Sequence, residues 1–126
     1  MPLVTVTVRK PKPAGFKDAV LDAVHASLQH IGVPPTDLFQ RVMELDAEDF
    51  RFHPTYPDAA RPRGDDFVLI EVLLSAGRSV KVKREFLSKL GQLLEAAGLD
   101  MEQVMVVFRE TTWENWSFAG GRQIHV

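Results

Sequence analysis

The sequence predicts a protein of the α/β (α+β) class, in which two β-α-β repeats form a four-stranded sheet with two helices on one face. The main observation is that the chain matches itself when it is shifted by 66 residues, so that Lys17 falls on Lys83 and Gly32 on Gly98. In each half, a strand-like run is followed by an amphipathic helical pattern, a glycine and a second strand-like run. Units of this length favour parallel strands joined by a right-handed crossover.

The chain has 126 residues, a formal net charge of -2 and no cysteine. This size fits one domain, residues 1–126, and this charge gives no basic field for nucleic acid. The internal repeat covers residues 2–45 and 68–110, with a connection at 46–67 and a tail or hairpin at 111–126. Without cysteine there is no disulfide or thiol chemistry, and with no signal peptide in view we expect a cytoplasmic protein.

The first repeat begins almost at the start of the chain. Leu3–Val8 is rich in β-branched residues, which suits a strand. Apolar residues at helical spacing predict a helix over Phe16–His30, and Gly32 is its expected end. The strand that completes the repeat is expected at Phe39–Leu45.

The second repeat follows the same order. The run Ile70–Leu74 aligns with the first strand, and a helix is predicted over Val80–Ala97. Ser79 is the expected N-cap of this helix and Gly98 its expected stop. The closing strand is expected at Gln103–Phe108.

The two segments outside the repeat are rich in turn-forming residues. The connection Asp46–Asp66 is expected to cross the surface with a short strand at Phe50–His53. In the tail, Gly120-Gly121 predicts a turn and Gln123–Val126 a short final strand.

Helices on one face leave the other face of the predicted sheet uncovered. Leu69, Leu73 and neighbouring apolar positions on that face would then be exposed to water in a single chain. We therefore expect the protein to self-associate.

Several stretches resemble one known family. They are PLVTV from Pro2, GVPPTDLFQRV at Gly32–Val42, AGRS before the second helix, and WSFAGGR at Trp116–Arg122. Their order and spacing are similar to the tautomerase superfamily, and most of all to its malonate semialdehyde decarboxylase-like branch. The resemblance implies a tautomerase-like β-α-β fold and a homotrimer with active sites between subunits.

The resemblance also implies that Pro2, exposed by removal of Met1, is the catalytic amine. An α-amino group has a pKa of roughly 7.7–8.0 in water, and an apolar pocket lowers it. A neutral amine can move a proton between an enol oxygen and a carbon atom. The alternative is a proline that merely begins a strand, where its missing N–H costs little.

Four other positions carry predicted roles, of which those of Arg78 and Asp37 are implied by the resemblance. Arg78, in the turn before the second helix, is expected to bind a substrate carboxylate and to assist catalysis, the alternative being a solvated turn residue. Asp37 is expected to assist the chemistry or to act only as a turn residue. Trp116 and Phe118 are expected to form the apolar wall of a substrate site, or to pack between subunits, whereas Trp113 is assigned to packing.

One position departs from the decarboxylase branch, which carries two arginines spaced Arg-x-Arg in this turn. Here the first of them is Ala76. With half of the carboxylate clamp missing, tautomerisation of a 2-oxo acid enol is favoured over decarboxylation, hydration or dehalogenation.

No metal or cofactor is predicted. The four histidines, His25, His30, His53 and His125, lack the spacing of metal ligands and are expected at the surface. No phosphate-binding or dinucleotide-binding glycine motif is present. The sequence thus predicts a cofactor-independent tautomerase acting on a small carboxylate, with no nucleic-acid or membrane partner. The alternatives are a lyase like malonate semialdehyde decarboxylase or hydratase, and a non-catalytic trimer that binds a small acid.

Overall fold

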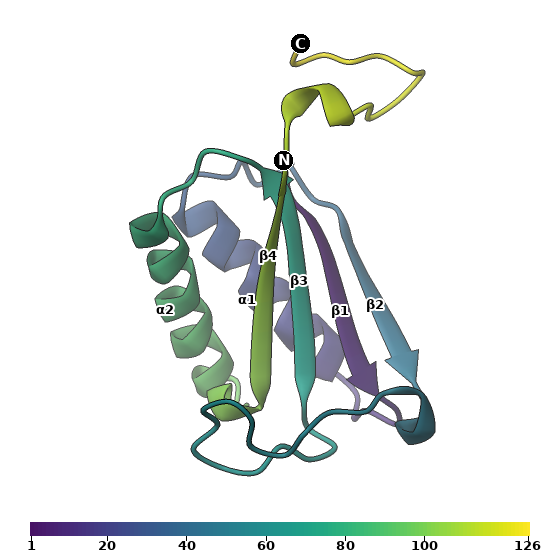
Figure 1. Cartoon of the computed structure of the whole chain (residues 1–126), viewed down its shortest axis with the longest axis vertical. Coiled ribbons are helices and arrows are strands. Elements are labelled where there is room, and N and C mark those ends of the chain that lie inside the picture. Colours follow the sequence, from purple (N-terminus) through teal and green to yellow (C-terminus); the bar gives the residue numbers. More distant parts are fainter.

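The computed structural model describes all residues, Met1–Val126, and contains one sheet with two α-helices (Figure 1). The elements of the first repeat are β1 (Leu3–Arg9), α1 (Phe16–His30) and β2 (Gln40–Leu45). Those of the second are β3 (Val68–Ser75), α2 (Val80–Ala96) and β4 (Val104–Thr111). The short 3-10 helices are η1 (Ala47–Asp49), η2 (Met101–Gln103) and η3 (Trp113–Asn115).

The sheet has four strands in the order β2-β1-β3-β4. β1 pairs in parallel with β2, and β3 pairs in parallel with β4, as expected for two β-α-β units. The two units join through antiparallel pairing of β1 with β3, in which Leu3 lies opposite Leu73 and Val8 opposite Val68. The start of β1 therefore lies at the same edge of the sheet as the end of β3. This confirms the predicted fold class.

The core lies between the sheet and the two helices. Val4–Val8 of β1 are all buried, and alternate residues of β3 are buried, among them Ile70. Val6 of β1 and Ile70 lie in the core. Leu28 on α1 and Phe86 on α2 meet them from the helical layer, and none of these side chains is more than 1% exposed. Burying side chains of this size contributes roughly 1.5–3 kcal/mol each, so this layer sets the rigidity of the strands.

The helix ends follow the predicted signals. The hydroxyl of Ser79 accepts a hydrogen bond from the N–H of Val82, which caps α2. Gly32 and Gly98, just beyond the two helices, have φ values of 102° and 85°, where a glycine is least strained. Both helices therefore stop where the sequence predicts, within one residue.

The opposite face of the sheet has no helix over it. Leu69 and Leu73 are only half-buried there, and Met43 and Met105 are 45% and 47% exposed. Charged groups interrupt this surface, since Nη1 of Arg109 lies 3.2 Å from Oε2 of Glu71. The prediction of uncovered apolar residues on this face is confirmed, and the charged residues among them were not predicted.

Two predicted strands are absent. Phe50–His53 is not a strand, because the rings of Phe50 and Phe52 pack on Phe67 and the side chain of Arg9 donates two hydrogen bonds to the carbonyl of Phe50. The prediction for Gln123–Val126 is also wrong: the tail passes beyond the end of the sheet and has no strand edge beside it (Figure 1). Neither α1 nor α2 is long and apolar enough to cross a membrane.

Candidate active site

A pocket of about 530 Å³ lies at the edge of the sheet where β1 begins. The first residue of the chain, the loop between α1 and β2, the turn before α2 and the C-terminal tail all contribute to its wall. Segments far apart in sequence meet here because the β1–β3 pairing brings the start of the chain beside the end of β3.

Pro2 is buried but does not itself line this pocket, whereas Met1 does. The nitrogen of Pro2 is part of the Met1–Pro2 peptide bond. Pro2 immediately precedes β1, which begins at Leu3. Removal of Met1 would make the nitrogen of Pro2 the terminal amine of the chain.

Asp37 lies beside the amino group. Its Oδ2 is 3.7 Å from the nitrogen of Met1, and its side chain is only 7% exposed. The N–H of Asp37 donates to the carbonyl of Pro34, so a turn aims the carboxylate into the pocket. The other oxygen, Oδ1, is buried without a hydrogen-bond partner.

The loop that carries Asp37 is held by α1. Nε2 of His25 lies 2.9 Å from the carbonyl oxygen of Pro35 and donates a hydrogen bond to it. The same loop supplies Val33, a buried core residue that also lines the pocket. The loop is thus fixed on both sides of its two prolines. The prediction that His25 is only a surface residue missed this contact.

Arg78 faces the pocket from the turn before α2 and is half-buried. Its Nη1 is 3.4 Å from the carbonyl oxygen of Ser75 at the end of β3, a long contact that leaves most of its donors free. Ala76, where a second arginine would stand in the decarboxylase branch, is exposed and does not line the pocket. Arg78 is therefore the one arginine in the wall.

The pocket lowers the pKa of the Met1 amino group. Burial is the largest cause, because it disfavours the charged form, and the positive charge of Arg78 acts in the same direction. The carboxylate of Asp37 opposes both effects and raises the pKa through its charge and a hydrogen bond. The amine thus lies between an acid that favours its protonated form and surroundings that favour its neutral form.

Aromatic side chains from the tail close one side of the pocket. Phe118 lines it and stacks on Phe39, with ring centroids 6.1 Å apart. Trp116 does not line the pocket but stacks behind Phe118 at 5.5 Å, with its Nε1 buried and unpartnered. The two aromatic residues predicted for the wall therefore form two layers.

Sequence reasoning missed two residues of this wall. Trp113, which was assigned to packing, and His125, which was expected at the surface, both line the pocket, and their ring centroids are 4.5 Å apart. The glycine pair Gly120-Gly121 turns the tail back toward η3, and Nε2 of Gln123 donates to the carbonyl of Glu114 at 2.8 Å. The glycine turn was the only signal in the sequence for this return.

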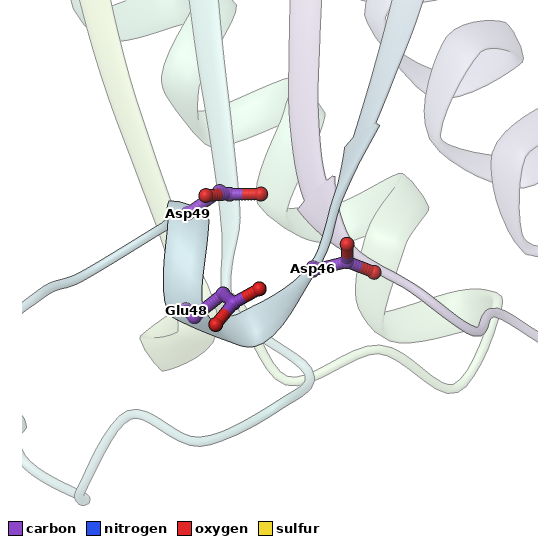
Figure 2. A group of neighbouring side chains, drawn as sticks. All are labelled: Asp46, Glu48 and Asp49. Carbon is purple, nitrogen blue, oxygen red and sulfur yellow. The ribbon is translucent and has the colours of Figure 1, made fainter.

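Two other features lie away from this pocket. A second hollow of about 480 Å³, at the edge where β3 begins, is lined by residues that include Gly15, Val68 and Gly98. Asp46, Glu48 and Asp49 form an exposed acidic group around η1, with ligand atoms within 4.8 Å of one another (Figure 2). Lys10 lies 3.5 Å from Asp46 and offsets part of this charge. Exposed acidic groups of this kind are common on protein surfaces.

Known proteins resemble the chain over nearly its whole length. A curated relative, the probable tautomerase YusQ of Bacillus subtilis (strain 168), is 24% identical over 124 residues, which cover 97% of this chain and 96% of that protein. A fused 4-OT symmetric trimer is 26% identical with a TM-score of 0.73, and the match covers 95% of this chain and 94% of that one.

Two solved decarboxylases have a higher TM-score of 0.86. One is a malonate semialdehyde decarboxylase that has decarboxylase and hydratase activities. It is 26% identical, and the match covers 96% of this chain and 93% of that one. The other is the FG41 malonate semialdehyde decarboxylase inhibited by 3-bromopropiolate, 24% identical, with 96% and 92% covered. These likenesses support the tautomerase superfamily and its malonate semialdehyde decarboxylase-like branch.

The family model for tautomerase enzymes matches residues 37–119. This range includes Asp37, the whole second repeat and the aromatic residues of the tail as far as Phe118. Since the match covers more than half of the chain, the protein belongs to the tautomerase enzyme family.

Proposed function

We propose that the protein is a cofactor-independent tautomerase that uses the amine of Pro2, freed by removal of Met1, on a small 2-oxo acid or its enol. The observation that carries this proposal is that Met1, which precedes Pro2, lines one pocket together with Asp37, Arg78 and an aromatic wall. The family is known for tautomerases, and the curated relative bears that name.

The proposed reaction is a proton transfer within the substrate. The neutral amine of Pro2 takes the proton from the enol hydroxyl, so that the O–H bond breaks and a C=O bond forms. The electrons of the C=C bond then take a proton from the ammonium to form a C–H bond at carbon 3. The amine is regenerated, and no oxidant, reductant or cofactor is consumed.

Each neighbour has a distinct task in this scheme. Arg78 binds the substrate carboxylate, for which its planar guanidinium is suited. Asp37 keeps the pKa of the amine from falling too far, since a base whose pKa is too low accepts a proton poorly. Phe118 and Trp113 exclude water, which strengthens the contact between Arg78 and the carboxylate.

A second candidate is a lyase activity of the malonate semialdehyde decarboxylase or hydratase type. It is favoured by the two decarboxylase structures and by Asp37, an acid placed beside the amine. Ala76 argues against it, because the wall has one arginine where the branch has two. A third candidate, a non-catalytic trimer that binds a small acid, needs only the carboxylate contact of Arg78.

We further propose that the protein is a homotrimer. The sheet face that carries Leu69 and Leu73 has no helix over it, and a fused 4-OT with 26% identity is a trimer. The single-domain organisation with its internal repeat, and a cytoplasmic location, stay predictions from the sequence.

The test is ketonisation of phenylenolpyruvate, followed by ultraviolet absorbance, on untagged protein with Pro2 and on the Pro2→Ala variant. The mass of each protein is measured first, because a retained Met1 blocks the amine. We expect turnover that is lost in Pro2→Ala while the circular dichroism spectrum is unchanged. Equal turnover in both proteins would contradict the role of Pro2, whereas malonate semialdehyde consumption without ketonisation would favour the lyase.

A further inference from the structure

One face of α1 holds the loop that carries Asp37. Leu21 and His25 are four residues apart on this helix, so they lie on the same face, one turn from each other. Nε2 of His25 donates a hydrogen bond to the carbonyl of Pro35 at 2.9 Å. Nε2 of Gln40 donates to the carbonyl of Leu21, also at 2.9 Å. The helix therefore holds the chain on both sides of Asp37, two residues before it and three residues after it.

The loop has little freedom of its own. Pro34 and Pro35 have φ fixed by their rings, and the N–H of Asp37 donates to the carbonyl of Pro34 at 3.0 Å. The N–H of Val33 donates to the carbonyl of Leu28 at 3.0 Å, which ties the start of the loop to the last turn of α1. The direction of the Asp37 carboxylate thus depends on where α1 holds this loop.

The far end of the loop is tied to the start of the chain. The N–H of Val4 donates to the carbonyl of Phe39 at 2.9 Å, and Val4 lies opposite Gln40 in the β1–β2 pairing. Met1 and Asp37 each precede that pair by three residues. Oδ2 of Asp37 is 3.7 Å from the nitrogen of Met1, and the Asp37 side chain is only 7% exposed. A shift of the loop relative to α1 would therefore change this separation.

We propose that His25 and Gln40 are positioning residues, which hold the carboxylate of Asp37 beside the amine at the start of the chain. Neither of them lines the pocket, so neither touches a substrate bound there. The contact of His25 does not depend on its charge, because Nε2–H is present in the imidazolium and in one neutral tautomer. The inference rests on the proposed use of the Pro2 amine and names the residues that keep its acidic neighbour in place.

The separation matters because Asp37 acts on the amine through its charge. The ionisable groups of the pocket are the terminal amine, Asp37, Arg78 and His125. Asp37 raises the pKa of the Met1 amine, whereas burial and Arg78 lower it. At an effective dielectric constant of about 20, an extra separation of about 1 Å from Asp37 lowers the amine pKa by about 0.7. We expect the same sign for Pro2 after Met1 is removed.

Exposure of the amine to water would act in the opposite direction. Burial is the largest cause that lowers the pKa of the Met1 amine, so a loop that lets in water would raise this pKa. The two effects are separated in the Asp37→Asn background. There the loop has no carboxylate to move, and a change in it acts on the amine through exposure alone.

The experiment measures the pKa of the terminal amine directly and needs no substrate. Trace acetylation of the full untagged chain with acetic anhydride is followed as a function of pH. After digestion with trypsin, mass spectrometry quantifies the first peptide and shows whether it begins with Met1 or Pro2. This peptide ends at Arg9 and contains no lysine, so its acetylation reports on the terminal amine alone.

The variants separate the hydrogen bonds from other properties of the side chains. His25→Leu and Gln40→Met each remove one donor, whereas His25→Gln keeps a donor at similar reach without a titrating ring. His30→Leu, at the exposed end of the same helix, is the matched control. Circular dichroism checks that each variant folds, and the two donor-free variants test the same contact surface independently.

We expect the amine pKa to fall by about 0.7 in His25→Leu and in Gln40→Met, and by more in Asp37→Asn. It should stay unchanged in His25→Gln and in His30→Leu. In the Asp37→Asn background, His25→Leu should give no further fall. An unchanged or raised pKa in either donor-free variant, or an equal fall without the carboxylate of Asp37, would overturn the proposal.

The failure of the proposed function would look different. A protein that shows this pattern of amine pKa values but does not ketonise phenylenolpyruvate would retain the positioning of Asp37 without the tautomerase. Turnover that depends on Pro2, together with an unchanged amine pKa in His25→Leu, would retain the tautomerase without the positioning role. If both hold, the acidic limb of kcat/KM should move to lower pH in His25→Leu while KM stays the same.

Discussion

Oδ2 of Asp37 lies 3.7 Å from the amino nitrogen of Met1, at the mouth of a pocket that also holds Arg78. The carboxylate and the amine come from opposite ends of the first repeat. They meet because β1 and β2 are parallel neighbours, which places the loop before β2 beside the start of β1. The pair is therefore a consequence of topology, and its effect on the amine can be tested.

The first prediction concerns Asp37→Asn. Asp37 raises the pKa of the Met1 amine. We expect the same sign for the Pro2 amine after Met1 is removed, so Asp37→Asn should lower that pKa and leave more of the amine neutral at acid pH. If the neutral amine is the base, the acidic limb of kcat/KM for phenylenolpyruvate should move to lower pH. The pH–rate profile measures this shift. The control is Asp46→Asn, which removes an exposed acid far from the pocket. If the acidic limb of Asp37→Asn stays at the same pH or moves to higher pH, the prediction is contradicted.

The second prediction concerns Arg78→Gln. Losing a charge-assisted contact with a carboxylate should raise KM by about tenfold or more, since such hydrogen bonds contribute roughly 1.5–3 kcal/mol. Arg78 also lowers the pKa of the Met1 amine. We expect the same sign for Pro2, so in Arg78→Gln the acidic limb of kcat/KM should move to higher pH, opposite to Asp37→Asn. Arg84→Gln on the exposed side of α2 is the matched control. An unchanged KM would remove Arg78 from substrate binding.

The third prediction concerns assembly through the uncovered sheet face. Leu73→Lys places a charge on that face, near the edge where β1 begins, and a second copy packed there would have to desolvate it. A single chain can keep the ammonium in water while the stem covers the sheet, so folding should survive. Sedimentation should show trimers for the unsubstituted protein and for Gln92→Lys on α2, and monomers for Leu73→Lys. Trimers of Leu73→Lys would indicate a different interface.

The fourth prediction concerns the connection between the repeats. Hydrogen bonds from the Arg61 guanidinium and from the N–H of Glu102 hold the pKa of Asp100 at about 2. In Arg61→Gln, the Asp100 pKa measured by NMR titration should rise toward its usual range near 3.9. Arg51→Gln, an exposed arginine of the same connection, should leave it unchanged.

The same pair gives a prediction about stability. Because the pKa of Asp100 is lower in the folded state, its stabilising effect is present above about pH 4 and is lost as the pH falls through about 2. Urea unfolding should therefore show unsubstituted protein more stable than Arg61→Gln at pH 7, with the difference shrinking at acid pH. A difference that is independent of pH would contradict this interpretation.

The repeat made most of the fold predictable. The expected bounds of α1 agree with the structure, and those of α2 differ by one residue, because glycines that adopt positive φ follow both helices. Parallel pairing within each unit also followed from the repeat. The strand order depends on the antiparallel pairing of β1 with β3, which was not predicted. Sequence-based prediction and structure agree where a residue's environment is set by the helix or strand that contains it.

Prediction failed where a residue's environment is set by segments distant in sequence. Phe50–Phe52 has a strand-like composition but forms no strand. The ring of Phe50 packs on Phe67, and Arg9 donates a hydrogen bond to the Phe50 carbonyl. His125 is one of four histidines without a motif, and its place beside Trp113 depends on how the tail turns over the end of the sheet. Asp37, which lies in a recognisable turn, could be proposed from the sequence.

The internal repeat has a consequence for how many reactive centres one chain can have. The shift of 66 residues carries Arg78 onto Lys12 and Gly32 onto Gly98, and each half has its own hollow at the start of its first strand. A polypeptide has a single α-amino group, however, and the start of β3 is an internal peptide bond. Chemistry that uses that amine is thus confined to one half of a nearly symmetrical molecule. Three such chains would carry three amines in six hollows. The residues of the other three hollows could then change without loss of the chemistry that uses the amine.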